Sequence, residues 1–165
     1  MVLGLPLETF TRVHVVISLI GIVTGLVATY GLIGGRRMRG WTTAFLVTTI
    51  LTSVTGFFFP FHGLTPAHVV GVISLIVLAL AGIAMQTDWR KTYAISSVIA
   101  LYLNCFVLVV QSFQKVPALH ALAPKGNEPP FAVVQLIVLA LFVWMGFLAA
   151  RRKVGTAGAM GAPAA

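Results

Sequence analysis

Five long apolar runs, separated by short polar or proline-containing connections, make up most of the chain. A helix needs roughly 17–25 mainly apolar residues to cross the hydrocarbon core of a bilayer, and each run has this length. The pattern predicts an all-α membrane protein, a bundle of five transmembrane helices in a single integral membrane domain over residues 1–153. The expected spans are residues 13–33, 42–59, 66–85, 92–113 and 131–150, and the Gly- and Ala-rich residues 154–165 are expected to form a disordered tail.

The second run, residues 42–59, is the shortest of the five and the richest in hydroxyl side chains. A re-entrant segment is the alternative to a full span for such a run. Re-entry would break the charge alternation described next, so a full span is expected. Small and hydroxyl-bearing residues mark close helix contacts in membranes, and Thr48, Thr52 and Thr55 are interpreted in this way.

Basic residues lie in the short connections, and their distribution predicts the orientation of the chain. Cytoplasmic flanks of transmembrane helices carry the excess of Lys and Arg. If the five spans alternate, the N-terminus is therefore expected outside and the C-terminus in the cytoplasm. The cytoplasmic group is Arg36, Arg37, Arg39, Arg90, Lys91, Arg151, Arg152 and Lys153, and the outer group is Arg12, Lys115 and Lys125.

Composition narrows the classes of function. The chain is 59% hydrophobic and 8% charged, whereas soluble domains carry about 25% charged residues, so the lipid bilayer is the expected partner. The net charge of +8 follows from the flanking basic residues, and no basic stripe with interleaved aromatic residues indicates nucleic acid. No span contains a charged residue, which argues against a pump or an ion-coupled carrier. The sequence also lacks a catalytic motif, a metal-binding motif and a second cysteine beside Cys105, so we expect no catalytic residues.

The four histidines, His14, His62, His68 and His120, all fall on the expected outer side. His14 and His68 each lie about one turn inside a predicted helix, so their rings are expected at a similar depth. Two imidazoles on neighbouring helices are able to ligate a b-type haem, and they are also able to hydrogen-bond a quinone carbonyl. His14 and His68 are therefore the candidate cofactor-binding residues. The alternatives are that both rings cap helix ends, or that they share zinc or copper with another histidine.

Amide side chains follow one face of the fourth run. Ser97, Asn104 and Gln111 recur every seven residues, and Gln135 lies near the outer end of the fifth run. An amide at bilayer depth is costly unless it is paired, so Asn104 is expected to contact a Thr or Ser of residues 42–59. Hydrogen bonding between helices is one interpretation of this face. The other is a polar pocket formed by Asn104, Gln111 and Gln135, open to the outside.

Three stretches carry a resemblance to a known group of proteins. They are residues 48–60 (TTILTSVTGFFFP), residues 66–75 (PAHVVGVISL), and residues 113–131, which begin FQKVP and end EPPF. In these stretches the chain resembles small multi-pass proteins of Proteobacteria that are described as hypothetical membrane proteins. The resemblance covers most of residues 10–150. It implies a location in the bacterial inner (plasma) membrane, and it carries over no activity and no functional residue.

Three functions are compatible with these observations. The leading expectation is a small integral inner-membrane protein without catalytic activity, acting as a subunit or accessory factor. Its partners would be other membrane subunits or a second copy of the chain. The alternative is a redox or cofactor-binding protein that holds haem b or a quinone through His14 and His68. A third alternative is a passive channel for small molecules along Asn104 and Gln111.

Overall fold

The computed structural model describes residues 2, 4–60, 66–87 and 89–151. These residues form six α-helices and one isolated bridge between Val2 and Leu5. His62 and the tail predicted for residues 154–165 lie outside the described residues. The helices are α1 (Leu7–Ile33), α2 (Arg39–Gly56), α3 (Pro66–Gln86), α4 (Arg90–Lys115), α5 (Pro117–Leu122) and α6 (Pro129–Arg151).

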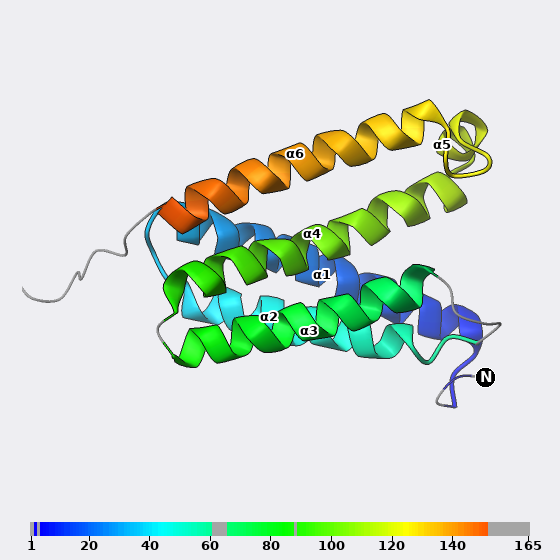
Figure 1. Cartoon of the computed structure of the whole chain (residues 1–165). Coiled ribbons are helices and arrows are strands. Elements are labelled where there is room, and N and C mark those ends of the chain that lie inside the picture. The colour runs from blue at the N-terminus through cyan, green and yellow to red at the C-terminus, as the bar shows by residue number, and fades with distance from the viewer. Residues whose placement is uncertain (1, 3, 61–65, 88, 152–165) are drawn as a thin grey trace, which may run out of the picture.

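The five long helices run back and forth along one axis, and the short α5 lies at one end of the bundle (Figure 1). α1 and α3 both pack against α2 and α4, and α6 packs mainly on α4. Four helices are long and apolar enough to cross a membrane: α1, α3 from His68 onward, α4 and α6. The all-helical fold is thus confirmed, and four of its helices suit a membrane protein. α2, which contains the second apolar run, is not among the four.

Several helix ends differ from the expected spans, and two of them change what the helices contain. α1 begins at Leu7 rather than at Val13, because Pro6 precedes it and the helix extends past the apolar run into polar residues. α2 ends at Gly56, so the aromatic residues Phe57 and Phe58 lie in the following turn and not in the helix. Hydropathy reports which residues suit the bilayer interior, whereas a helix continues until its backbone is capped or blocked.

A Schellman motif ends α1. The Arg36 amide donates to the Gly31 carbonyl at 2.8 Å, and the Gly35 amide donates to the Leu32 carbonyl at 3.0 Å. Gly35 has a φ of +76°, a backbone conformation that favours glycine. The motif turns the chain sharply, so that the basic residues of the first connection lie at the end of the bundle.

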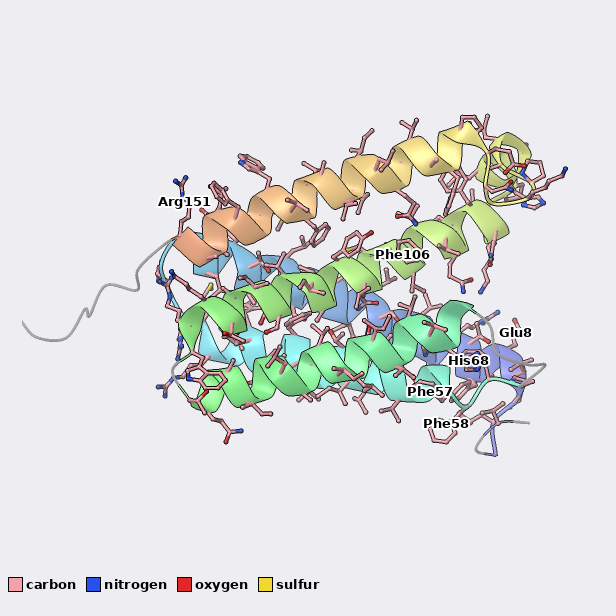
Figure 2. All side chains as sticks on the ribbon, in the orientation of Figure 1. Glu8, Phe57, Phe58, His68, Phe106 and Arg151 are labelled. Atoms are coloured by element: carbon pink, nitrogen blue, oxygen red, sulfur yellow. The ribbon has the colours of Figure 1, made fainter. Side chains whose placement is uncertain are left out.

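The two ends of the bundle differ in chemistry. The Arg37 guanidinium lies 5.7 Å from the centroid of the Tyr93 ring, so the first connection meets the start of α4. Arg151 lies at this same end, which we call the basic end (Figure 2). Glu8, Phe57 and His68 lie at the other end, which we call the histidine end. The basic end thus contains Arg37 and Arg151, two of the residues expected to be cytoplasmic.

The tightly packed core occupies the half of the bundle next to the basic end. Phe45 of α2 and Leu101 of α4 are 1% and 0% exposed, and both press on Gly25 of α1. A Cβ at Gly25 would lie 2.6 Å from Leu101 Cδ1 and 2.7 Å from Phe45 Cδ2, so the glycine sets the approach of three helices. The core of this packed half is Leu32, Phe45, Leu46, Leu78, Ala81, Ala84, Tyr93, Ala94, Val98, Ala100, Leu101, Phe142 and Ala149.

Candidate functional site

The half of the bundle next to the histidine end contains a cavity of about 680 Å³ between α1, α2, α3 and α4. In Figure 1 the ribbons of α3 and α4 separate toward this end. Most of the cavity wall is apolar, and polar side chains from all four helices interrupt it. The polar lining residues are Thr11, His14, Ser18, Thr49, Thr52, Ser53, His68, Ser74, Asn104, Gln111, Ser112 and Lys115.

His14 lines the cavity from α1 and is held by two contacts. Its Nδ1 lies 2.8 Å from Thr55 Oγ1 of α2. Its ring also packs against Phe59 in a T-shaped arrangement, with the ring centroids 5.1 Å apart and the planes at 87°. Phe59 in turn packs against the buried Phe10, so an aromatic cluster encloses the outer side of His14. Because α1 begins at Leu7, His14 lies about two turns into the helix and not one.

His68 lines the same cavity from the first turn of α3. Its ring packs against Phe57, with centroids 5.9 Å apart and the planes at 50°. Figure 2 shows both residues at the end of the bundle that also carries Glu8. The tertiary structure therefore brings the two candidate histidines to one cavity. A ligand shared between their rings stays a prediction.

The hydroxyl groups of α2 divide into two kinds. Thr48 and Thr55 donate to the carbonyls of Ala44 and Leu51 in their own helix, at 2.7 and 2.6 Å. Thr49 and Thr52 line the cavity, and their buried hydroxyls have no hydrogen-bond partner in the described part of the chain. A buried polar group without a partner costs about 1–3 kcal/mol, so these two hydroxyls are available to a ligand or to water.

The two amides of α4 that the sequence singles out also line the cavity. Asn104 Nδ2 donates to the Ser18 carbonyl at 3.5 Å, at the long limit of a hydrogen bond. The expected partner, a hydroxyl of α2, is therefore wrong: Gly21 lets the amide approach the α1 backbone, where a Cβ would lie 3.2 Å from Asn104 Nδ2. Gln111 Oε1 is buried and accepts no hydrogen bond from the described residues.

Gln135 and Ser97 do not join this group. Gln135 projects from α6 and donates to the Phe106 carbonyl at 3.2 Å, so it pairs α6 with α4 away from the cavity wall. Gln135 is not among the residues that line this cavity, so its grouping with Asn104 and Gln111 in one pocket stays a prediction. The side chain of Ser97 is 2% exposed and lies three residues before Ala100, within the packed half. The seven-residue spacing of Ser97, Asn104 and Gln111 therefore extends along α4 beyond the cavity and into the packed half.

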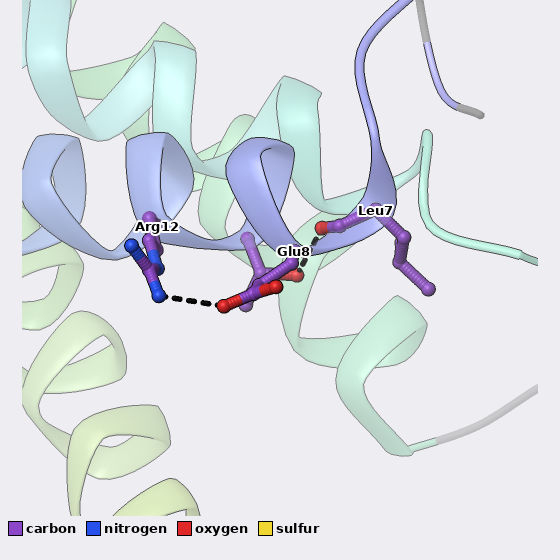
Figure 3. Close-up of polar contacts among 4 residues, drawn as sticks. Leu7, Glu8 and Arg12 are labelled. Carbon is purple, nitrogen blue, oxygen red and sulfur yellow. Dashed lines mark hydrogen bonds and ion pairs between the residues drawn. The ribbon is translucent and has the colours of Figure 1, made fainter.

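Lys115 is the only charged residue on the cavity wall as far as the chain is described. Arg12, on the exposed side of α1, is paired with Glu8 at 2.6 Å, and Thr11 donates to the Leu7 carbonyl beside this pair (Figure 3). His120 is exposed on α5 and does not line the cavity. Across the described ranges, no three His, Cys, Asp or Glu side chains gather in a group that could hold a metal ion.

No protein-family model, curated protein or solved structure matches this chain. A fold hosts many unrelated functions in any case, so function has to be argued from the chemistry of the site. Sequence patterns indicated His14, His68, Asn104 and Gln111. They did not single out Thr49. The preceding Thr48 carries the same hydroxyl group, and the sequence alone does not show which of the two lines the cavity.

Proposed function

We propose that this chain is an integral membrane protein that binds a membrane-soluble, amphipathic small molecule in the cavity at the histidine end. One observation carries the proposal: a cavity of about 680 Å³ has a mostly apolar wall on which buried polar atoms of Thr49, Thr52 and Gln111 receive no hydrogen bond from the described residues. Ligand pockets typically measure about 300–1,000 Å³ and combine apolar walls with a few polar groups that orient the ligand. Thr49, only 2% exposed, supplies such a group.

The lining residues indicate an uncharged ligand with oxygen-bearing groups. The threonine hydroxyls and the Asn104 and Gln111 amides are neutral, and each is able to donate a hydrogen bond to a carbonyl or hydroxyl oxygen. Ile22, Leu103 and the other apolar lining residues suit a ring or an alkyl chain. Compounds of the quinone and quinol class combine these two features.

The proposal includes a topology of five spans, with the N-terminus outside and the C-terminus in the cytoplasm of a bacterial inner membrane. Gathering of the basic residues at one end of the bundle supports it, as does the resemblance to proteobacterial membrane proteins. α2 is not among the four helices found apolar enough to cross a membrane, but its Thr42, Thr49 and Ser53 are buried against protein and not exposed to lipid. Periplasmic-reporter fusions after Lys153 should be inactive, and activity there would exclude five alternating spans.

Two adjacent valines of α3 provide a matched test of ligand binding. Val70 lines the cavity, whereas Val69 is 54% exposed on the outer surface of the helix. The wild-type protein, Val70→Trp and Val69→Trp would be transferred from native membranes into nanodiscs, and co-purifying small molecules identified by mass spectrometry. We expect a ligand enriched in the wild type and in Val69→Trp, and depleted in Val70→Trp because the indole fills the cavity. Equal amounts in all three, or no enrichment over empty nanodiscs, would refute the proposal.

A b-type haem is the second candidate ligand, favoured by the two histidines on one cavity wall. Haem would be held by imidazole nitrogens, and it would supply one-electron redox chemistry when bound. The test is an absorption spectrum of protein expressed with added haem precursor. A Soret band and a reduced α-band that disappear in His68→Ala would support haem, and a flat spectrum would exclude it.

The other two expectations from the sequence stay predictions. A subunit or accessory role agrees with ligand binding, since an accessory protein is able to carry the ligand of a larger assembly. A passive channel would have to continue from the cavity through the packed half, where Leu101 is 0% exposed. Ligand binding is therefore the function that we favour.

A further inference from the structure

The hydrogen bonds around His14 define which of its ring nitrogens carries a proton. Thr55 Oγ1 lies 2.6 Å from the Leu51 carbonyl, which can only accept, so the hydroxyl hydrogen is directed at that carbonyl. The same oxygen lies 2.8 Å from His14 Nδ1. Both contacts are satisfied when Nδ1–H donates to Thr55. Neutral His14 therefore carries its proton on Nδ1, and Nε2 is left with a lone pair.

His14 lines the cavity, and its contact with Thr55 engages only the Nδ1 side of the ring. Gly56 follows Thr55 in α2 and also lines the cavity; it has no side chain, and a Cβ there would lie 3.9 Å from His14 Cε1, so no side chain from this position covers the ring. No hydrogen bond to Nε2 is formed by any described residue. An imidazole whose first nitrogen is anchored in this way presents its second nitrogen in a defined direction, as metal-ligating and proton-accepting histidines do.

We infer that His14 is a specificity-determining residue that selects ligands with a hydroxyl group, of the phenol or quinol type, by accepting their O–H hydrogen bond at Nε2. A quinone carbonyl or an ether oxygen has no proton to donate, so it would meet the Nε2 lone pair with repulsion. The nearby hydroxyls of Thr49 and Thr52 donate to a second oxygen of the same ligand. This inference rests on the proposed binding function and states which chemical form is bound.

The first test needs no ligand. Nitrogen-15 NMR of histidine-labelled protein distinguishes a protonated ring nitrogen from an unprotonated one, and His14→Asn identifies the His14 resonances. We expect Nδ1 to be protonated in the wild type and in Thr55→Ser, which keeps the hydroxyl. Thr55→Val removes the acceptor and should shift the tautomer toward Nε2–H. A wild-type ring that is protonated on Nε2 would overturn the inference while leaving ligand binding untouched.

The second test compares two probes that differ by one proton donor, a long-chain 4-alkylphenol and its methyl ether. Binding isotherms are measured in nanodiscs, with empty nanodiscs subtracted. One neutral hydrogen bond corresponds to about fivefold in affinity, so the phenol should bind about fivefold more tightly to the wild type. The preference should vanish in His14→Leu and Thr55→Val. It should persist in Thr48→Val, because Thr48 bonds only within its own helix, to the carbonyls of Ala44 and Phe45.

The outcomes separate the inference from the proposed function. If both probes bind equally to the wild type and are excluded by Val70→Trp, the cavity binds ligands but His14 does not select a hydroxyl group. If neither probe binds the wild type above the level of Val70→Trp, the proposed binding function fails for this class of compound. A preference for the phenol that survives in His14→Leu would assign the selection to another residue and overturn the inference.

Discussion

The two halves of this bundle are both built on α1, α2, α3 and α4, with α6 joining the core of the packed half, and yet they differ in how they are filled. Next to the basic end, Phe45 and Leu101 are buried and press on Gly25, and Ala84 belongs to the same core. Next to the histidine end, the same helices enclose a cavity of about 680 Å³ with His14 and Asn104 on its wall. The packed half therefore holds the helices together, and the hollow half is available for a ligand.

Side-chain chemistry explains the difference. Lipid tails are as apolar as leucine, so helices in a membrane associate through close van der Waals contact, for which small residues are best suited. Ala81, Ala94 and Ala100 are 0% exposed in the packed half and bring the backbones together. In the hollow half, Thr49 and Gln111 occupy inward-facing positions with polar atoms that no described residue satisfies. A structure selected only for stability would not keep such atoms buried.

The largest expected effect contrasts two leucines of α4. Leu101 is fully buried in the packed half, and Leu103 lines the cavity. Leu101→Ala should lower the free energy of unfolding by about 2–5 kcal/mol, because the side chain leaves an internal void. Leu103→Ala should cost much less, since the cavity already leaves its atoms with few neighbours. Reversible unfolding in detergent measures both, and equal losses would mean that the two halves are packed alike.

The next effect concerns glycines. Gly25→Ala should destabilise the protein by about 1–3 kcal/mol, because the added methyl group would overlap Leu101 and Phe45 within a rigid core. Gly82→Ala, on α3, is the matched control, since nothing lies within 4 Å of a Cβ at that position. Thermal unfolding of the two variants should differ clearly. A Gly25→Ala variant as stable as Gly82→Ala would contradict the close approach of α1, α2 and α4.

A smaller effect of opposite sign is expected at Thr49. Thr49→Val removes a buried hydroxyl without a partner among the described residues, so the ligand-free protein should gain about 1 kcal/mol in unfolding free energy. The same change should weaken binding of the alkylphenol probe. Thr48→Val, one residue earlier, removes a hydroxyl that is hydrogen-bonded to its own helix. This variant should neither raise the unfolding free energy nor weaken binding of the probe. Equal responses would show that the hydroxyl of Thr49 has no special role.

The smallest effect concerns the exposed connection before α6. The amides of Lys125 and Asn127 donate to the Glu128 carboxylate at 2.9 and 3.0 Å, and these backbone hydrogen bonds lower the pKa of Glu128 below its ordinary value of 4.5. A lowered folded-state pKa means that the stabilisation is present above the ordinary value and is lost as pH falls through the folded value. Amide proton shifts of both residues should titrate in that acidic window. Glu128→Gln should abolish the titration, and shifts that persist in this variant would assign them to another group.

Sequence patterns predicted the helices well because an apolar run can be recognised from consecutive residues, without knowledge of their tertiary contacts. The five apolar runs correspond to five long helices, and Pro117 and Pro129 begin α5 and α6, where the lack of an amide hydrogen is tolerated. Helix ends were predicted less well. α1 extends back to Leu7 because polar residues continue an exposed helix as readily as apolar ones do. The threonines of α2 were interpreted as packing residues, and Thr52 instead lines the cavity.

The sequence by itself determined that the chain forms long apolar α-helices suited to a membrane, that most of its basic residues fall in connections at one end of the bundle, and that His14, His68, Asn104 and Gln111 are candidate side chains. Each of these properties depends on residues that are close together in the sequence. Only the tertiary structure decided that those four residues share a cavity, that Gln135 faces elsewhere, and that His14 is anchored through Thr55. The physical reason is that a cavity depends on the rotation and separation of four helices at once, and small residues such as Gly25 fix that separation through contacts between distant parts of the chain.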